Sequence, residues 1–339
     1  MRAPRFWYRP AGLSARLLEP ASRVWDLCGW LRARRAKPLL VGAPVICVGN
    51  LVAGGAGKTP IALALNAMLR DWGIDGHFLT RGYGGALTGP VRVAPGLHDA
   101  GDVGDEALLL AQAAPTWVAR DRAAGALAAC AAGAGALVLD DGFQNHALGY
   151  RLSVLVVDGA TGFGNGRLIP AGPLREPVER GLARASAIVV MGEDEAGIGS
   201  RAQTFAAANG GHLPVFHARL APDAAVADFL RGQRVLAFAG IGRPAKFFDT
   251  LNHLGAHLAE TVALPDHHRF RRDEALTLLE RAHALRAIPV TTAKDFVRLP
   301  EIARAGVTVL PVTVSWRNGA AFARLLAAAV GREDIEPHG

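Results

Sequence analysis

Residues 48–60, VGNLVAGGAGKTP, have the make-up of a loop that binds phosphate. An apolar strand precedes the loop and a helix is expected to open at Lys58, so backbone amides and a helix N-terminus would face an anion. Lys58 would reach the β- and γ-phosphates of a nucleotide, and Thr59 would ligate Mg²⁺. The predicted nucleotide-binding residues are Gly54, Gly55, Ala56, Gly57, Lys58 and Thr59.

The loop departs from the common pattern G-x-x-x-x-G-K-[ST], because Val52 stands where that pattern has glycine. The three glycines that follow still allow a phosphate to approach the backbone closely. GGxGKT is also the form found in the P-loop branch of partitioning ATPases and related kinases. The alternative interpretation is a tight glycine turn that contains a lysine by chance.

A pair of acids, Asp140 and Asp141, ends the apolar run ALVLD at residues 136–140. Carboxylates at the end of a buried strand are costly unless they bind something. A Walker B acid holds Mg²⁺ from this position, beside the phosphate loop. The alternative is a strand end that lies in solvent.

Other residues could act on an acceptor. Asp105 and Glu106 begin a helix, where acids also serve as simple N-terminal caps. The string LPDHHRF groups an aspartate with His267 and His268, which suits proton transfer, a weak metal site or a chance pair. Arg175, and Arg167 before it, stand in a loop rich in Pro and Gly, where an arginine can stabilise phosphoryl charge.

Three classes of P-loop protein compete at this point. A GTPase needs N-K-x-D, and the nearest string, TAKD at 292–295, has the wrong spacing. A partitioning ATPase carries a second lysine before GG, where this chain has Ala53. A small-molecule kinase needs a base and cations, and both are present.

Strand-like and helical runs alternate from residue 44, which predicts a parallel sheet with helices on both faces. We therefore expect an α/β fold: a three-layer P-loop NTPase domain, a smaller α/β domain and an N-terminal amphipathic helix. Expected strands are 44–50, 136–140, 152–158, 185–192, 234–240, 288–293 and 307–314. Expected helices are 60–71, 105–114, 121–132, 243–255 and 272–286. The predicted units are 1–37 (helix), 38–215 (nucleotide-binding kinase domain), 216–325 (smaller domain with linker) and 326–339 (loose tail).

The formal net charge of +7 is concentrated at the N-terminus. Residues 1–37 hold nine Lys/Arg and two acids, which leaves the remainder balanced. Three scattered cysteines favour neither disulfides nor a zinc site, which is typical of a reducing cytosol.

Within the basic segment, residues 13–31 place apolar side chains at helical spacing. Charges interrupt the apolar run, which argues against a membrane span and a signal peptide. The helix could lie on an anionic bilayer, dock on its own domain or, less suitably for its apolar face, bind nucleic acid. Pro20 is expected to bend or restart it.

Taken together, these motifs resemble the tetraacyldisaccharide 4'-kinase family, the lipid A 4'-kinases of Gram-negative bacteria. The motifs, in chain order, are GNLVAGGAGKTP (49–60), TRGYGG (80–85), VGDE (103–106), DDGFQ (140–144), LIPAGPLREP (168–177), AFAGIGRP (237–244), DHH (266–268) and TAKD (292–295). The resemblance runs from the N-terminal helix to about residue 315.

The resemblance implies transfer of the ATP γ-phosphoryl to the 4'-hydroxyl of a membrane lipid, tetraacyldisaccharide 1-phosphate, giving lipid IVA. It implies a P-loop domain joined to a smaller domain by a short β linker, with the N-terminal helix on the cytosolic face of the inner membrane. The implied cofactors are ATP and Mg²⁺. No nucleic acid and no obligate protein partner is inferred.

Site residues follow by motif from the same resemblance. Asp105 matches the catalytic aspartate, and His267 matches the histidine that pairs with it across the cleft. Arg175 matches the arginine that contacts phosphate, and Lys58 takes the loop role. The implied metal-site residues are Thr59, Glu106, Asp140 and Asp141. We expect Asp105, oriented by His267, to accept the hydroxyl proton.

Two positions depart from the family pattern. DDGFQH becomes DDGFQN, with Asn145 and then His146, and TEKD becomes TAKD, with Ala293. The alternative function is a membrane-associated regulatory ATPase, which would have no small acceptor and no use for Asp105 and His267.

Overall fold

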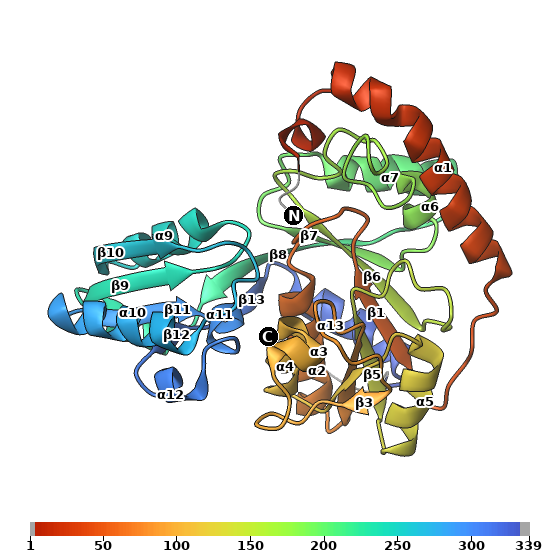
Figure 1. Cartoon of the computed structure of the whole chain (residues 1–339). Coiled ribbons are helices and arrows are strands. Elements are labelled where there is room, and N and C mark those ends of the chain that lie inside the picture. The colour runs from red at the N-terminus through yellow and green to blue at the C-terminus, as the bar shows by residue number, and fades with distance from the viewer. Residues whose placement is uncertain (1–3, 333–339) are drawn as a thin grey trace.

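The computed structural model describes residues 4–332, and two α/β bodies are visible in Figure 1. The large body contains a nine-stranded sheet of order β13-β8-β7-β6-β1-β5-β2-β4-β3. The small body contains a four-stranded sheet of order β10-β9-β11-β12. The predicted α/β class is therefore confirmed.

Most neighbouring strands of the large sheet are parallel, and only β3–β4 and β8–β13 are antiparallel. Every residue of β1, β2 and β5 is buried, as expected for central strands that helices cover on both faces. The strands are β1 Val45–Gly49, β2 Gly76–Thr80, β3 Val91–Arg92, β4 Thr116–Val118, β5 Ala136–Asp140, β6 Leu152–Asp158, β7 Ala187–Met191, β8 Val215–Pro222 and β13 Val312–Trp316.

The register of the central strands determines where the site forms. β1 lies between β5 and β6, and Val48 pairs with Asp140. The loop that follows β1 and the acids that end β5 consequently share the carboxyl edge of the sheet, where ligands bind in open α/β sheets.

Helices cover the large sheet through two main apolar clusters. On one face, α2 and α13 bury Ile61, Leu65 and Leu326 against β1, β5 and β6. On the other, α6 and α7 pack on β6 and β7. The helices outside the small body are α1 Leu13–Arg35, α2 Lys58–Asp71, α3 Ala100–Val103, α4 Asp105–Ala111, α5 Arg122–Ala131, α6 Val178–Leu182, α7 Ile198–Ala208 and α13 Gly319–Ala329, with a 3-10 turn η1 Arg5–Tyr8.

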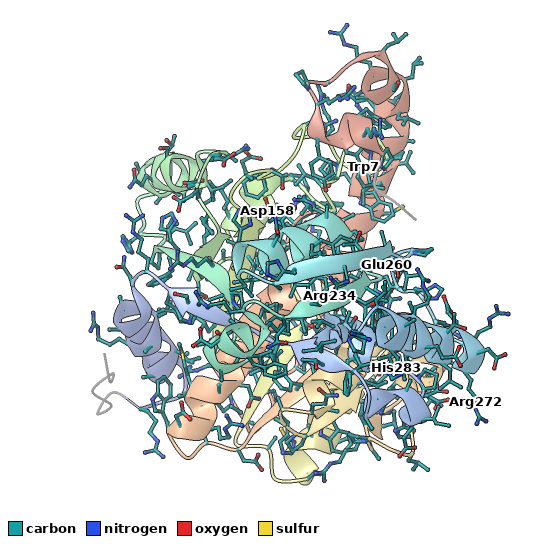
Figure 2. The ribbon with its side chains drawn as sticks, turned by 90° about the vertical axis from the view of Figure 1, so that its left-hand side faces the viewer. Trp7, Asp158, Arg234, Glu260, Arg272 and His283 are labelled. Carbon is teal, nitrogen blue, oxygen red and sulfur yellow. The ribbon has the colours of Figure 1, made fainter. Side chains whose placement is uncertain are left out.

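The small body is also layered, because alternate residues of its central strand face two separate cores. Val235 of β9 packs with α9, whereas Leu236 packs with α10. In Figure 2 the small body faces the viewer, with Arg234 labelled on β9 and Glu260 on the neighbouring β10. Its elements are α8 Ala224–Leu230, β9 Arg234–Ala239, α9 Pro244–His253, β10 His257–Ala263, α10 Arg272–Ala284, β11 Ile288–Thr292, α11 Ala293–Phe296, α12 Glu301–Arg304 and β12 Thr308–Leu310.

The division of the chain differs from the predicted units at both ends of 216–325. β8 and β13 belong to the large sheet and form an antiparallel pair, Ala218–Pro222 with Val312–Trp316, through which the chain enters and leaves the small body. The expected strand 307–314 is interrupted at Pro311, which has no N–H to donate to a ladder. The expected loose tail begins too early, because α13 continues to Ala329 and buries Leu326 fully.

α1 is one helix through Pro20, so of the expected bend or restart at this proline the restart does not occur. Ser22 of α1 donates to the Leu168 carbonyl at 2.8 Å, and the Trp25 indole donates to the Arg175 carbonyl at 2.9 Å. Within residues 4–332 no helix combines the length and the apolar character that crossing a bilayer requires.

We expect Phe322→Ala to destabilise the large body by about 3–5 kcal/mol. Phe322 is fully buried and packs against Phe216 and Trp316, with ring centroids 5.1 Å and 4.4 Å away. Urea unfolding would measure the change, with Phe229→Ala as a control because Phe229 is 55% exposed. Equal stability of the two variants would contradict the packing of α13 on the large sheet.

Candidate functional site

The loop after β1 folds into an anion-binding turn at the start of α2. Gly57 is the N-cap and has φ +87°, a left-handed conformation, and an added Cβ would meet the Met191 side chain at 3.2 Å. α2 extends over 14 residues, so its first amides and its dipole point into the loop. The predicted strand–loop–helix unit is present in full.

Lys58 folds back over this loop. Its Nζ lies 3.3 Å from the Gly54 carbonyl oxygen and 3.7 Å from Oδ1 of Asp141. Only 11% of the side chain is exposed. The ammonium is thus held beside the amides, where phosphate oxygens could replace the carbonyl as its partners.

Asp140 is a buried carboxylate whose surroundings suit a cation ligand. Thr59 Oγ1 donates to its Oδ2 at 2.9 Å, whereas its buried Oδ1 has no hydrogen-bond partner. Burial, and then the charge of Glu106, raise the pKa of Asp140 to about 7. A bound cation would offset both the desolvation of the Asp140 carboxylate and its repulsion by Glu106.

These residues fit Mg²⁺, which takes hard oxygen ligands and in phosphate sites keeps water and phosphate in its shell. Among residues 4–332 no group of three His, Cys, Asp or Glu is assembled for a metal. Asp140 and Thr59, which are hydrogen-bonded to each other, would supply protein ligands, with the remainder from nucleotide and water.

Asp141 is arranged differently from Asp140. It has φ +55°, and its Oδ1 accepts from Arg175 Nη1 at 2.9 Å. Burial opposes ionisation of Asp141, but Lys58 and Arg175 lower its pKa. Arg175 also donates to Gln144 at 3.0 Å, so Asp141 and Gln144 together hold the arginine beside the loop lysine.

The second half of the site joins the two bodies. His267 Nδ1 of the small body lies 2.9 Å from Oδ2 of Asp105, the first residue of α4. The Asp105 side chain is 6% exposed, and burial alone would raise its pKa. The hydrogen bond from His267 and the charge of Arg298 outweigh burial, so the pKa of Asp105 is lowered.

His267 has φ +58°, in the left-handed region that few residues other than glycine adopt, and its ring nitrogen meets Asp105. The hydrogen bond to Asp105 raises the pKa of His267. His268 faces away and pairs with Glu274 at 2.8 Å, so His267 alone of the two meets Asp105.

Glu106 does not stand free for a metal in this arrangement. Lys294 Nζ of α11 lies 2.8 Å from its Oε1. Burial opposes the charge of Lys294, but Glu106 raises its pKa, and Asp105 and Asp140 act in the same direction. The Asp105 pair and the phosphate loop are thus parts of one charged region.

Sequence reasoning missed Arg298 altogether and gave Lys294 no role. The Arg298 side chain is 3% exposed, and its Nε donates to Oδ2 of Asp105 at 2.9 Å. The one available signal was position: Arg298 comes shortly after the expected strand 288–293, whose carboxyl end lies at the edge of the sheet where ligands bind.

Three further residues lie away from this centre. Arg167 pairs with Glu19 of α1. Asn145 Oδ1 accepts from its own loop at the Ala147 amide, 2.9 Å away. His146 borders a cavity of about 580 Å³ beside the last turns of α1.

Comparisons with known proteins agree with one another. Residues 14–331 match the family model described as "Tetraacyldisaccharide-1-P 4'-kinase". The chain is 54% identical over 338 residues to the tetraacyldisaccharide 4'-kinase of Rhodospirillum centenum, covering 98% of each chain. It is 50% identical over 326 residues to that of Rhodospirillum rubrum, covering 96% of this chain and 97% of the other.

A solved structure is similar as well. LpxK from Aquifex aeolicus, crystallised in complex with ATP, is 25% identical. The match covers 93% of this chain and 99% of that one, with a TM-score of 0.72.

Proposed function

The chain belongs to the tetraacyldisaccharide 4'-kinase family, and from this premise we propose how its residues perform the reaction. The enzyme transfers the γ-phosphoryl of ATP to the 4'-hydroxyl of tetraacyldisaccharide 1-phosphate, a step of lipid A biosynthesis. The alternative of a regulatory ATPase without an acceptor is not favoured by these relatives.

One observation supports the site assignment most directly. A carboxylate and a histidine from different bodies meet 2.9 Å apart, and Glu106, next to the carboxylate, acts electrostatically on the buried Asp140. A nucleotide on the loop and a hydroxyl at Asp105 would therefore be neighbours. An ATPase without an acceptor has no need of such a pair.

Asp105 receives the acceptor in this proposal. Among residues 4–332, its Oδ1 accepts only from the Glu106 amide, at 3.0 Å, and keeps a lone pair for the 4'-hydroxyl. Because the lowered pKa makes this carboxylate a weak base, it orients the hydroxyl first and takes the proton late, as the bond to phosphorus forms. His267 fixes the carboxylate from the small body, so catalysis requires the closed cleft.

Lys58 and Arg175 neutralise the phosphoryl group as it moves. Both side chains pair with Asp141, and phosphate oxygens would replace that carboxylate as their partner. Mg²⁺, held by Asp140 and Thr59, would stabilise charge on the β- and γ-phosphate oxygens when bound.

Phosphoryl transfer itself tests the function. Detergent-solubilised enzyme is incubated with γ-labelled ATP, Mg²⁺ and tetraacyldisaccharide 1-phosphate, and the lipid is extracted. We expect label in the lipid, in proportion to ADP formed. Hydrolysis of ATP with no label in the lipid would instead favour the regulatory ATPase.

We also propose that α1 places the enzyme on an anionic membrane surface, the cytosolic face of the inner membrane. The helix is docked through Ser22 and Trp25, yet its outer side exposes large apolar residues. These are Leu13 (74%), Leu17 (73%), Val24 (62%), Leu27 (55%) and Trp30 (38%). Its last turn carries Arg32, Arg34 and Arg35, so apolar insertion and charge attraction act together.

We expect the double variant Leu13→Asn, Leu17→Asn to bind anionic liposomes on the order of 30-fold more weakly, a loss of about 2 kcal/mol. Sedimentation with phosphatidylglycerol vesicles measures the binding. The matched control replaces Leu97 and Leu127, which are 78% and 53% exposed elsewhere on the large body. Equal binding by the two double variants would contradict the membrane role of α1.

A further inference from the structure

Arg298 is a deeply buried cation that lies next to Asp105, between the two bodies. It follows α11, and its side chain is 3% exposed. Nε and Nη2 both donate to Oδ2 of Asp105, across the junction of the bodies. Nη1 donates to the Gly240 carbonyl at 2.9 Å and to Asp295 at 3.0 Å.

The guanidinium is held rigidly from its own side. Asp295 is fully buried, and its Oδ1 also accepts from the Gly240 amide at 3.0 Å. Its Oδ2 accepts from Thr292 Oγ1 at 2.7 Å. Contacts within the small body therefore fix the position of the Arg298 guanidinium independently of Asp105.

We propose that Arg298 is a positioning residue for phosphoryl transfer, which fixes the Asp105 carboxylate in one orientation when the two bodies are closed. The inference rests on the proposed role of Asp105. Arg298 and His267 together occupy Oδ2, which leaves Oδ1 to receive the acceptor hydroxyl.

The same contacts link closure to catalysis. Asp105 is buried with two partners from the small body, so separating the bodies removes both from the carboxylate at once. Opening would return Asp105 to water, and burying an ion pair gives little net stability. These contacts therefore define the geometry of the carboxylate in the closed state rather than drive closure. Lys294 of the small body and Glu106 of the large body, the residue after Asp105, form a second ion pair between the bodies.

The test compares Arg298→Met, which keeps the stem, with Arg298→Lys, which keeps the charge but not the fork. We expect Arg298→Met to lower kcat on the order of 100-fold, with KM for ATP changed less than about threefold. ATP meets the loop after β1, which Arg298 does not contact. Arg298→Lys should recover about tenfold of the loss.

Two further variants separate positioning from stability. Arg281→Met, at a surface ion pair of the small body, is the control and should keep wild-type kcat. Asp295→Asn removes part of the support behind the fork and should give a smaller kcat loss than Arg298→Met. If Arg298→Met does not fold, Arg298→Lys and Asp295→Asn still carry the test.

A double variant completes the experiment. Asp105→Ala with Arg298→Met should be no slower than Asp105→Ala alone, because the arginine acts through the carboxylate. The inference would be overturned if the kcat losses of Asp105→Ala and Arg298→Met multiplied in the double variant. An unchanged kcat in Arg298→Met, or an Arg298→Lys enzyme no faster than Arg298→Met, would also overturn it. A wild-type rate in Asp105→Ala would instead overturn the proposed role of Asp105.

Discussion

Asp105→Ala is expected to lower kcat for lipid phosphorylation about 10²–10⁴-fold, or about 3–5 kcal/mol of barrier. The buried carboxylate has a histidine partner on Oδ2 and keeps a lone pair on Oδ1 for the acceptor. KM for ATP should change little, because the nucleotide loop belongs to a different segment of the large sheet. Single-turnover transfer from labelled ATP into the lipid measures the loss.

Asp102→Ala is the matched control for this variant. Asp102 belongs to the adjoining helix α3 and caps it from the solvent side, where its carboxylate accepts from the Asp99 amide. We expect a local loss of helix stability of about 1 kcal/mol and nearly normal turnover. Turnover of Asp105→Ala within a few-fold of this control would remove Asp105 from the mechanism.

Lys58→Met is expected to reduce kcat/KM about 10²–10³-fold, through weaker ATP binding and weaker stabilisation of the transferring group together. The side chain is almost buried over its loop, so no other cation can replace its ammonium without moving the backbone. Arg175 shares Asp141 with Lys58, but in the proposed mechanism it already contributes its own charge to the transferring group. ATP titration by calorimetry and steady-state transfer separate the two contributions.

Lys246→Met, on the exposed side of α9, serves as the control for charge and length. It should retain wild-type ATP affinity and turnover. A Lys58→Met enzyme that binds ATP normally and still transfers phosphate would show that the loop works through its amides alone.

Local chemistry was readable from the chain wherever a single segment carries it. The strand, glycine turn and lysine of residues 45–58 lie within one continuous unit, so their geometry follows from propensity and φ requirements alone. Asp140 at the end of an apolar run was equally readable, because a fully buried strand must end where polar side chains can be satisfied. The alternation of strands and helices was enough for the α/β class.

Pairings between distant segments were not readable in this way. β8 and β13 join one sheet although almost 90 residues of chain separate them, and nothing in either segment encodes that partner. Arg298 was missed because its sequence neighbours are those of an ordinary helix end. The role proposed for Arg298 depends on its contact with Asp105, which lies 193 positions away in the chain.

The sequence by itself determined the strand–loop–helix unit at Lys58, the buried strand that ends in Asp140, and the alternation of strands and helices of an α/β fold, because each depends on residues a few positions apart. The tertiary structure decided which histidine meets Asp105, that Asp141 holds cations while Asp140 keeps an unpaired oxygen, and that Arg298 spans the two bodies. These outcomes depend on which side chains share a buried, low-dielectric space, and burial is a property of the packed chain rather than of any segment.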